Sequence, residues 1–215
     1  MPRSTGLDPA RLPDIATLRQ RAKALAMLDA ILSPEWEYRY YSFDAHWNEG
    51  EEMVSMRNGS GDDWFLLLGP YGAAIKGLAH ESSLAGDPTL AAAVKSQVPE
   101  TFASFLNEPA FSMDELSYCY WKGAEDLSWQ KVEHGNTLAT GVDDGSTEFL
   151  LPLIEPASAY VDFAREYYEI EVPLSAVELI YEQGVLTESL VKSLNPDLSF
   201  AEAKVFAAEI GYPCA

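Results

Sequence analysis

The stretch GSGDDWFLLLGPYGAAIKGLA (59–79) decides the fold class that we predict for this chain. Its two apolar runs, DWFLLL (63–68) and AAIKGLA (73–79), are separated by GPYG, a combination typical of a tight turn. Short connections of this kind join antiparallel strands, because parallel strands need a long crossover. The first run is apolar almost throughout. We therefore expect a central strand with Phe65 and Leu67 buried.

Further strands are expected on both sides of this pair. Upstream, the segments WEYRYYSF (36–43) and MVSMR (53–57) predict two strands joined by a loop at 44–52. Downstream, ELSYCYW (115–121) predicts a fifth strand. Connections that stay short over residues 36–79 favour an antiparallel meander.

Helical patterns flank these predicted strands. Apolar residues recur at helical spacing between Ile15 and Leu32 and predict an N-terminal helix. From Thr147 onward the chain is predicted to be mostly helical. Two capping boxes support this prediction, at Ser175 with Glu178 and at Ser199 with Glu202.

The predicted architecture is α+β. An N-terminal helix packs on an antiparallel sheet of four to five strands, and a mostly helical C-terminal region follows. We place a sheet domain at 14–140 and an acidic helical region at 148–213, which could also pack as part of the same domain. The turn-rich segment GVDDGSTE (141–148) is the expected boundary.

Composition indicates a globular protein of the cytoplasm. The chain has 215 residues, of which 47% are apolar and 22% charged. A chain of this length and composition can build a hydrophobic core without stabilising disulfides or metal ions. Its two cysteines, Cys119 and Cys214, do not suggest a disulfide framework. No secretory leader and no bilayer-length apolar run is present in the sequence. We therefore expect no membrane association.

The charge is strongly negative and unevenly distributed. The net charge is −20; residues 1–96 carry 9 basic and 13 acidic side chains, whereas residues 97–215 carry 5 and 21. Nucleic-acid binding needs clustered lysine and arginine, so we expect no nucleic-acid partner. An acidic surface attracts a basic protein, or keeps the chain dissolved. The sequence leaves the oligomeric state open.

The segment DAHWNEGEE (44–52) places one histidine among four carboxylates, a composition that allows three interpretations. It could hold a metal, supply an acid–base pair, or form a solvated hairpin loop. A metal site needs converging ligands with a supported second shell, and a single histidine on a loop gives no such pattern. We therefore predict no metal site and no cofactor. A binding role remains open for Asp44, His46 and Trp47.

Two other segments contain residues typical of active sites. RNGSGDD (57–63) alternates polar ligands as a calcium loop does, but it lacks the glycine and the final glutamate that such loops require. AHESS (79–83) contains histidine, glutamate and serine in sequence, whereas triad members come from separate elements. We therefore expect His80 to be a strand-end histidine bonded to a neighbouring backbone group. We assign no catalytic residues.

One region resembles a known family. Residues 59–82 run as Gly-Asp, an apolar strand, a turn glycine, a second strand and His-Glu, and an aromatic-rich helix follows at 99–107. This order resembles the SUKH superfamily, which includes bacterial toxin-immunity proteins and regulators of cell-wall synthesis. The matching positions cover about a quarter of the chain: Gly61, Asp62, Phe65, Leu67, Gly72, His80, Glu81, Phe102, Phe105 and Leu106. The resemblance implies a binding protein without enzymatic activity that neutralises a basic toxin.

Three functional hypotheses follow from these observations. The first is an acidic binding protein, of the immunity type, for a basic partner. The second is a small hydrolase that uses carboxylates, since two acids suffice for glycoside hydrolysis. The third is a structural or regulatory module with no small ligand. For the first hypothesis, the expected partner-binding residues are Asp44, His46, Trp47, Asp62, Asp63, His80, Glu81, Glu166 and Glu169.

Overall fold

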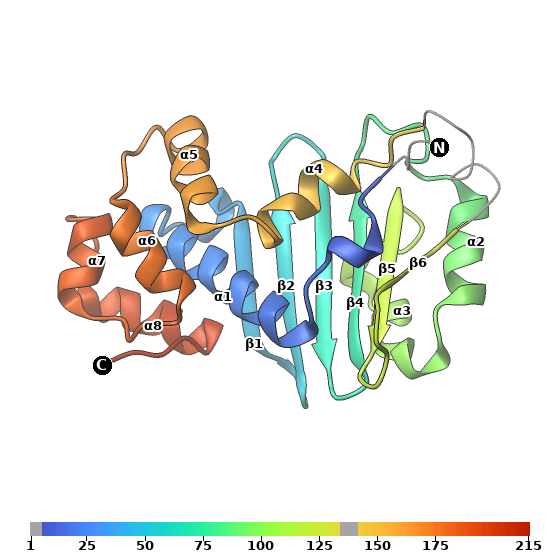
Figure 1. Cartoon of the computed structure of the whole chain (residues 1–215), viewed down its shortest axis with the longest axis horizontal. Coiled ribbons are helices and arrows are strands. Elements are labelled where there is room, and N and C mark those ends of the chain that lie inside the picture. Colours follow the sequence, from blue (N-terminus) through green and yellow to red (C-terminus); the bar gives the residue numbers. More distant parts are fainter. Residues whose placement is uncertain (1–5, 134–141) are drawn as a thin grey trace. The chain divides into compact units, whose positions relative to one another are not determined.

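The computed structural model describes residues 6–133 and 142–215. Its strands form one antiparallel sheet in the order β1-β2-β3-β4-β5-β6 (Figure 1). The strands are β1 (Tyr41–Asn48), β2 (Glu51–Arg57), β3 (Asp63–Gly69), β4 (Gly72–Leu78), β5 (Tyr118–Gly123) and β6 (Gln130–Lys131). The predicted α+β class is confirmed. The sheet has one strand more than predicted, because β6 is only two residues long and leaves no periodic pattern.

Helices precede the sheet, interrupt it and follow it. The α-helices are α1 (Ile15–Leu32), α2 (Pro88–Gln97), α3 (Ala103–Asn107), α4 (Ser146–Leu150), α5 (Ala157–Tyr167), α6 (Leu174–Tyr181), α7 (Glu188–Leu194) and α8 (Phe200–Ile210). The 3₁₀ turns are η1 (Pro9–Arg11), η2 (Trp36–Tyr38), η3 (Glu100–Phe102), η4 (Pro109–Phe111) and η5 (Leu151–Leu153). The N-terminal helix and the helical C-terminal region are therefore present as predicted.

The chain divides into two compact units that do not follow chain order. One comprises residues 1–15 and 55–151, and the other comprises residues 16–54 and 152–215. The predicted division into 14–140 and 148–213 stays a prediction, because residues 134–141 lie outside the described part of the chain.

In the unit of residues 1–15 and 55–151, strands β3 and β4 pair from Asp63 opposite Leu78 to Gly69 opposite Gly72. Helix α4 lies in front of these strands in Figure 1 and α3 lies behind them. On one face the Trp64 indole N–H donates to the Phe149 carbonyl of α4 at 3.0 Å. Because both faces of β3 are covered, its sequence is apolar from Trp64 to Leu68 rather than alternating.

The predicted core residues of β3 differ in burial. Leu67 is 1% exposed, as expected. Phe65 is only half-buried, contrary to the prediction. Its ring stacks on Phe111 with centroids 4.9 Å apart, and the Lys76 ammonium lies 5.5 Å from its centroid. Phe65 therefore lies at the partly exposed edge of the aromatic cluster that it forms with Phe111, not at a fully buried position.

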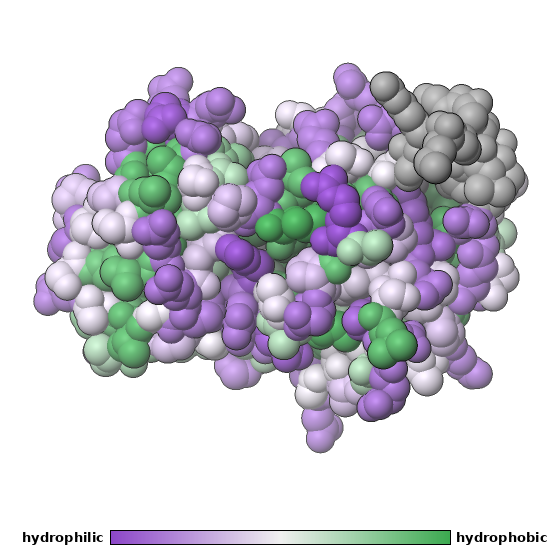
Figure 2. Space-filling view, in the orientation of Figure 1, coloured by the Kyte–Doolittle hydropathy of each residue, from purple (hydrophilic) through white to green (hydrophobic). Residues whose placement is uncertain are grey.

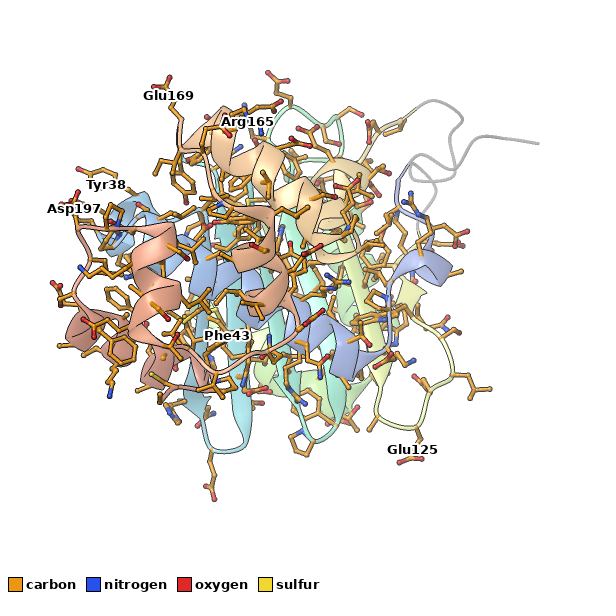
Figure 3. All side chains as sticks on the ribbon, turned by 60° about the vertical axis from the view of Figure 1, so that its left-hand side comes forward. Tyr38, Phe43, Glu125, Arg165, Glu169 and Asp197 are labelled. Carbon is orange, nitrogen blue, oxygen red and sulfur yellow. The ribbon has the colours of Figure 1, made fainter. Side chains whose placement is uncertain are left out.

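In the unit of residues 16–54 and 152–215, helix α1 packs against β1. The Lys23 ammonium lies 5.0 Å from the centroid of the Phe43 ring, which points into this unit (Figure 3). Helix α8 begins with the predicted capping box, in which Ser199 and Glu202 bond each other's backbone N–H groups. The other predicted box is wrong: α6 begins after Pro173, so Ser175 lies inside the helix.

A buried carboxyl group lies at the centre of this second unit. Asp29 of α1 is 0% exposed and accepts hydrogen bonds from the Tyr160 hydroxyl at 2.5 Å, the Tyr168 hydroxyl at 2.9 Å and the Tyr41 N–H at 2.7 Å. Burial raises the pKa of Asp29 to about 6, although these three donors oppose the shift. The group therefore changes its charge in the mildly acidic range.

Candidate binding site

Asp62 and His80 meet at one end of the β3–β4 pair. Asp62 directly precedes β3 and His80 lies just beyond β4, so the antiparallel register brings the two residues side by side. The His80 backbone N–H donates to Asp62 Oδ1 at 2.8 Å, and the His80 ring Nδ1 lies 2.7 Å from the same oxygen. The Gly-Asp and His-Glu segments singled out in the sequence therefore form one structural feature.

The turn before β3 holds the Asp62 carboxylate in place. The Asn58 side-chain amide donates to Asp62 Oδ2 at 2.5 Å, and Asn58 Oδ1 accepts from the backbone N–H groups of Ser60 and Asp62 at 2.8 Å and 3.1 Å. Burial would raise the pKa of Asp62, but the hydrogen bonds from His80 and Asn58 outweigh it and lower that pKa. The carboxylate is therefore ionised and fixed.

The His80 ring is oriented by a carboxylate, not by a neighbouring backbone group as predicted. The Asp62 contact fixes its Nδ1, and the side chain remains 43% exposed. Its Nε2 has no hydrogen-bond partner among the described residues. The ring therefore presents one free nitrogen in a defined orientation.

A recess of about 300 Å³ lies beside this pair. Its lining includes the apolar side chains of Ala79 and Phe149. The carboxylates that line it belong to Asp62, Glu81, Asp143 and Glu148, and none of its lining residues is lysine or arginine. Its volume lies at the lower end of the range for small-ligand sites.

The four carboxylates of the recess are not equally available to a ligand. Asp62 accepts hydrogen bonds from His80 and Asn58, and Asp143 Oδ1 accepts from the Gly145 N–H at 2.9 Å. In contrast, neither Glu81 nor Glu148 bonds a described residue through its side chain, and both are exposed. Two carboxylates are therefore free to pair with an incoming cation.

The recess offers little for nucleophilic chemistry. Among the described residues that line it, Ser82 is the only one with a hydroxyl group, and that hydroxyl donates to the Asp143 carbonyl at 2.7 Å and accepts from the Leu84 N–H at 3.2 Å. It makes no bond to His80. Over residues 6–133 and 142–215, no three His, Cys, Asp or Glu side chains are grouped as metal ligands.

The segment 44–52 is a tight hairpin rather than a loop. β1 extends to Asn48 and β2 begins at Glu51, so only Glu49 and Gly50 form the turn. The predicted strand at 36–43 is also displaced, because 36–38 form the 3₁₀ turn η2 and β1 begins at Tyr41. Strand pairing here satisfies the backbone groups that a loop would leave to water.

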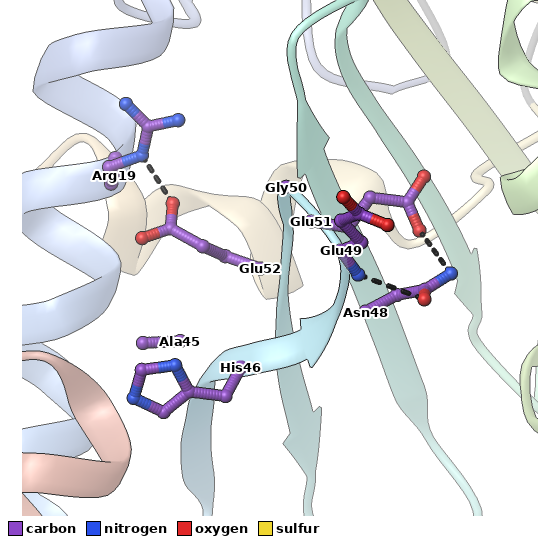
Figure 4. Close-up of a pocket in the computed structure, with 8 residues that line it drawn as sticks. All are labelled: Arg19, Ala45, His46, Asn48, Glu49, Gly50, Glu51 and Glu52. Carbon is purple, nitrogen blue, oxygen red and sulfur yellow. Dashed lines mark hydrogen bonds and ion pairs between the residues drawn. The ribbon is translucent and has the colours of Figure 1, made fainter.

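Most carboxylates of the hairpin already have partners. Figure 4 shows Glu52 directed to Arg19 of α1, with Nε at 2.5 Å from its carboxylate, and Glu51 beside Asn48 on the other side of the strand. Lys23 also pairs with Glu52 at 3.3 Å. Asp44 Oδ1 accepts from the His46 backbone N–H at 2.7 Å, while the His46 side chain is exposed. Trp47 is half-buried.

The hairpin therefore presents a shallow surface on which most carboxylates already have partners within the protein. The depression beside it has a volume of about 630 Å³ and is lined by both signs of charge. Asp44 and Trp47 do not line it, whereas His46 does. The geometry supports neither the acid–base pair nor a concentrated cation site.

The remaining predicted site residues lie elsewhere. Asp63 faces away from the recess and pairs with the buried Lys76 ammonium at 2.9 Å. Glu166 is exposed on α5, but Glu169 follows the end of that helix in a left-handed conformation with φ 58°. The two glutamates therefore do not lie on the same helix. Figure 3 shows Glu169 pointing outward near Arg165.

Two carboxylates of the recess were not predicted as site residues. Asp143 and Glu148 lie in the segment that the sequence marked only as a boundary. They reach the recess because the Ser82 hydroxyl holds the Asp143 carbonyl and the Ser117 hydroxyl donates to the Asp144 carbonyl at 2.8 Å. Nothing in the local pattern of 141–148 signals these contacts.

Comparisons with models of known protein families, with curated proteins and with solved structures found no match. Within the described residues, no helix is long and apolar enough to cross a bilayer.

Proposed function

We propose that this chain is an acidic binding protein that captures a basic protein by accepting a lysine or arginine side chain in the recess beside Asp62 and His80. The observation that carries the proposal is the recess itself, which is lined by four carboxylates and by no lysine or arginine. Glu81 and Glu148 supply the unpaired charge, and Asp62 and His80 supply a rigid wall.

The shape of the recess suits a long cationic side chain. Lysine and arginine place apolar methylene groups behind a charged head, so the stem packs on Ala79 and Phe149 while the head meets the two glutamates. The net charge of −20 adds long-range attraction, which raises the association rate more than the final affinity. The resemblance to the SUKH superfamily motivates an immunity-type role, in which the captured partner is a basic toxin.

The test compares two double variants of equal charge. Glu81→Gln with Glu148→Gln removes the free charge of the recess, and Glu178→Gln with Glu188→Gln removes the same charge from exposed positions on α6 and α7. The intact chain is used to capture basic proteins from the native cell extract at low salt, and the captured protein is then titrated with each variant. We expect the recess variant to weaken binding at least about tenfold and the control to leave it within about twofold.

Three results would count against the proposal. One is equal loss in both variants, which would indicate nonspecific charge attraction. A second is a loss confined to Glu166→Gln with Glu169→Gln, which would move the site to the end of α5. Failure to recover any basic protein above background would also count against a protein partner.

The oriented histidine favours a second candidate, a hydrolase in which His80 acts as a general base. Asp62 fixes the ring at 2.7 Å, as an orienting carboxylate does in acid–base catalysis. In that case water would be the nucleophile, since the Ser82 hydroxyl is engaged elsewhere. Hydrolysis of a panel of nitrophenyl esters, phosphates and glycosides that is lost in His80→Gln would support this candidate over the first.

A further inference from the structure

A small cavity in the unit of residues 16–54 and 152–215 is lined by four aromatic residues together with Leu25, Pro152, Ala159 and Glu155. Its volume is about 90 Å³, and its lining includes Tyr41, Tyr160, Phe163 and Tyr181. The Phe163 ring is inclined by 55° to Tyr41 and by 51° to Tyr160, with centroids 5.7 Å and 5.5 Å apart. The rings therefore stand at angles around a shared space rather than in one stack.

The cavity has a buried floor and a rim that reaches solvent. Tyr41 and Tyr160 are each 2% exposed, whereas Phe163, Tyr181 and Glu155 are half-buried. A volume of this size suits one compact head group and excludes a drug-sized ligand.

The charges around the cavity favour a cation. The Glu155 side chain belongs to the lining, and none of the lining residues is lysine or arginine. Asp29 does not line the cavity, but its carboxyl group accepts a hydrogen bond from the hydroxyl of the lining Tyr160 at 2.5 Å. The Arg21 guanidinium lies outside the lining, 4.8 Å from the Tyr181 ring centroid, so one positive charge already contacts this ring.

We infer that Tyr41, Tyr160, Phe163 and Tyr181 form an aromatic cage that binds a methylated ammonium group, with Glu155 at the rim as its counter-ion. The faces of aromatic rings carry negative electrostatic potential, so several rings around one cation add their attraction. A methylated ammonium group fits better than a primary one, because its methyl groups tolerate a dry cavity without hydrogen-bond acceptors on every side.

The first experiment separates charge from shape. Choline and its neutral isostere, 3,3-dimethyl-1-butanol, are titrated into the full chain and binding is followed by calorimetry and tyrosine fluorescence. We expect saturable choline binding and at least about tenfold weaker binding of the alcohol. Equal binding of both compounds, or no saturable binding of choline, would overturn the inference.

The second experiment uses a matched pair of ring deletions. Tyr181→Leu removes a rim ring that carries Arg21, and Phe206→Leu removes a half-buried ring of the same unit that carries Arg39 at 4.3 Å but does not line the cavity. We expect Tyr181→Leu to weaken choline binding at least about tenfold and Phe206→Leu to leave it within about twofold. Equal effects of the two variants would contradict the cage.

A third variant, Glu155→Gln, tests the counter-ion without removing a ring. It should weaken choline binding and leave the neutral alcohol unaffected. A peptide carrying trimethyl-lysine then distinguishes the source of the head group. Tighter binding of the peptide than of choline indicates a methylated protein, and the reverse order indicates a free small molecule.

Discussion

Leu67 and Leu127 are the same residue type at opposite extremes of burial. Leu67 on β3 is 1% exposed, and Leu127 in the β5–β6 connection is 99% exposed. We expect Leu67→Ala to lower the free energy of unfolding by about 2–5 kcal/mol, because it removes apolar contacts and leaves a cavity. Leu127→Ala should change it by less than about 0.5 kcal/mol. Urea denaturation of both variants measures the difference, and equal midpoints would show that Leu67 is not a core residue.

Asp29 should make stability depend on pH in the opposite sense to an ordinary carboxylate. Its pKa is about 6 in the folded chain against an ordinary 3.8, so the folded state binds the proton more tightly than the unfolded state. This contribution is fully present below about pH 4 and is lost as the pH rises through about 6. A shift of about two pKa units corresponds to roughly 3 kcal/mol.

The variant Asp29→Asn isolates this contribution. The asparagine side chain has no proton to release, so the variant does not lose this contribution as the pH rises. The difference in unfolding free energy, variant minus unmodified chain, should therefore rise by up to roughly 3 kcal/mol between pH 4 and pH 7. Asp197→Asn, at an exposed carboxyl group (Figure 3), is the control and should show no such trend. A constant difference for Asp29→Asn across this range would refute the assignment.

Residue patterns located part of the candidate site. The sequence marked Asp62, His80 and Glu81, because they flank two predicted strands joined by a tight turn. It did not show that His80 would bond the Asp62 carboxylate, since that contact depends on the register of β3 against β4. It also missed the roles of Asp143 and Glu148, which approach from a distant segment.

Ser175 and Ser199 both begin a capping-box pattern in the sequence, but they occupy different positions in their helices. Ser199 is the N-cap of α8 and accepts from the Glu202 N–H at 3.2 Å, whereas Ser175 lies inside α6. We expect Ser199→Ala to lower stability by about 1 kcal/mol, because the first turn loses a hydrogen-bond acceptor. Ser175→Ala should be neutral or slightly stabilising, since alanine is the better helix former. Thermal denaturation of the pair tests this, and equal losses would contradict it.

The β1–β2 hairpin shows why polar sequence is a poor guide to loops. Residues 44–52 are rich in charge and were predicted as a loop, yet all but two of them belong to strands. β1 is an edge strand of the sheet, so it has one neighbouring strand and several half-buried or exposed side chains. Such a strand carries polar residues without losing its backbone pairing.

At the scale of the whole molecule, the net charge of −20 should oppose compaction through self-repulsion. Salt screens that repulsion, because the Debye length falls from about 10 Å at 0.1 M to about 3 Å at 1 M. We expect the free energy of unfolding in urea at pH 7 to rise on the order of 1 kcal/mol between low and high sodium chloride. The effect should vanish near the isoelectric point of about 4.3. A fall in stability with salt at pH 7 would indicate that the ion pairs outweigh the repulsion.

The amino-acid sequence by itself determined the antiparallel pairing of β3 and β4, the N-terminal helix, the capping of α8 and the acidic character of the chain. Each of these depends on residues within a few positions of one another, where turn geometry and helical spacing act directly. Only the tertiary structure decided which carboxylates share a recess, that Asp29 is buried beneath tyrosines, and that Gly77 must lack a side chain. A Cβ at Gly77 would lie within the ring of Tyr118 on the neighbouring strand. These features arise from packing between segments far apart in the chain, and a local pattern carries no record of that packing.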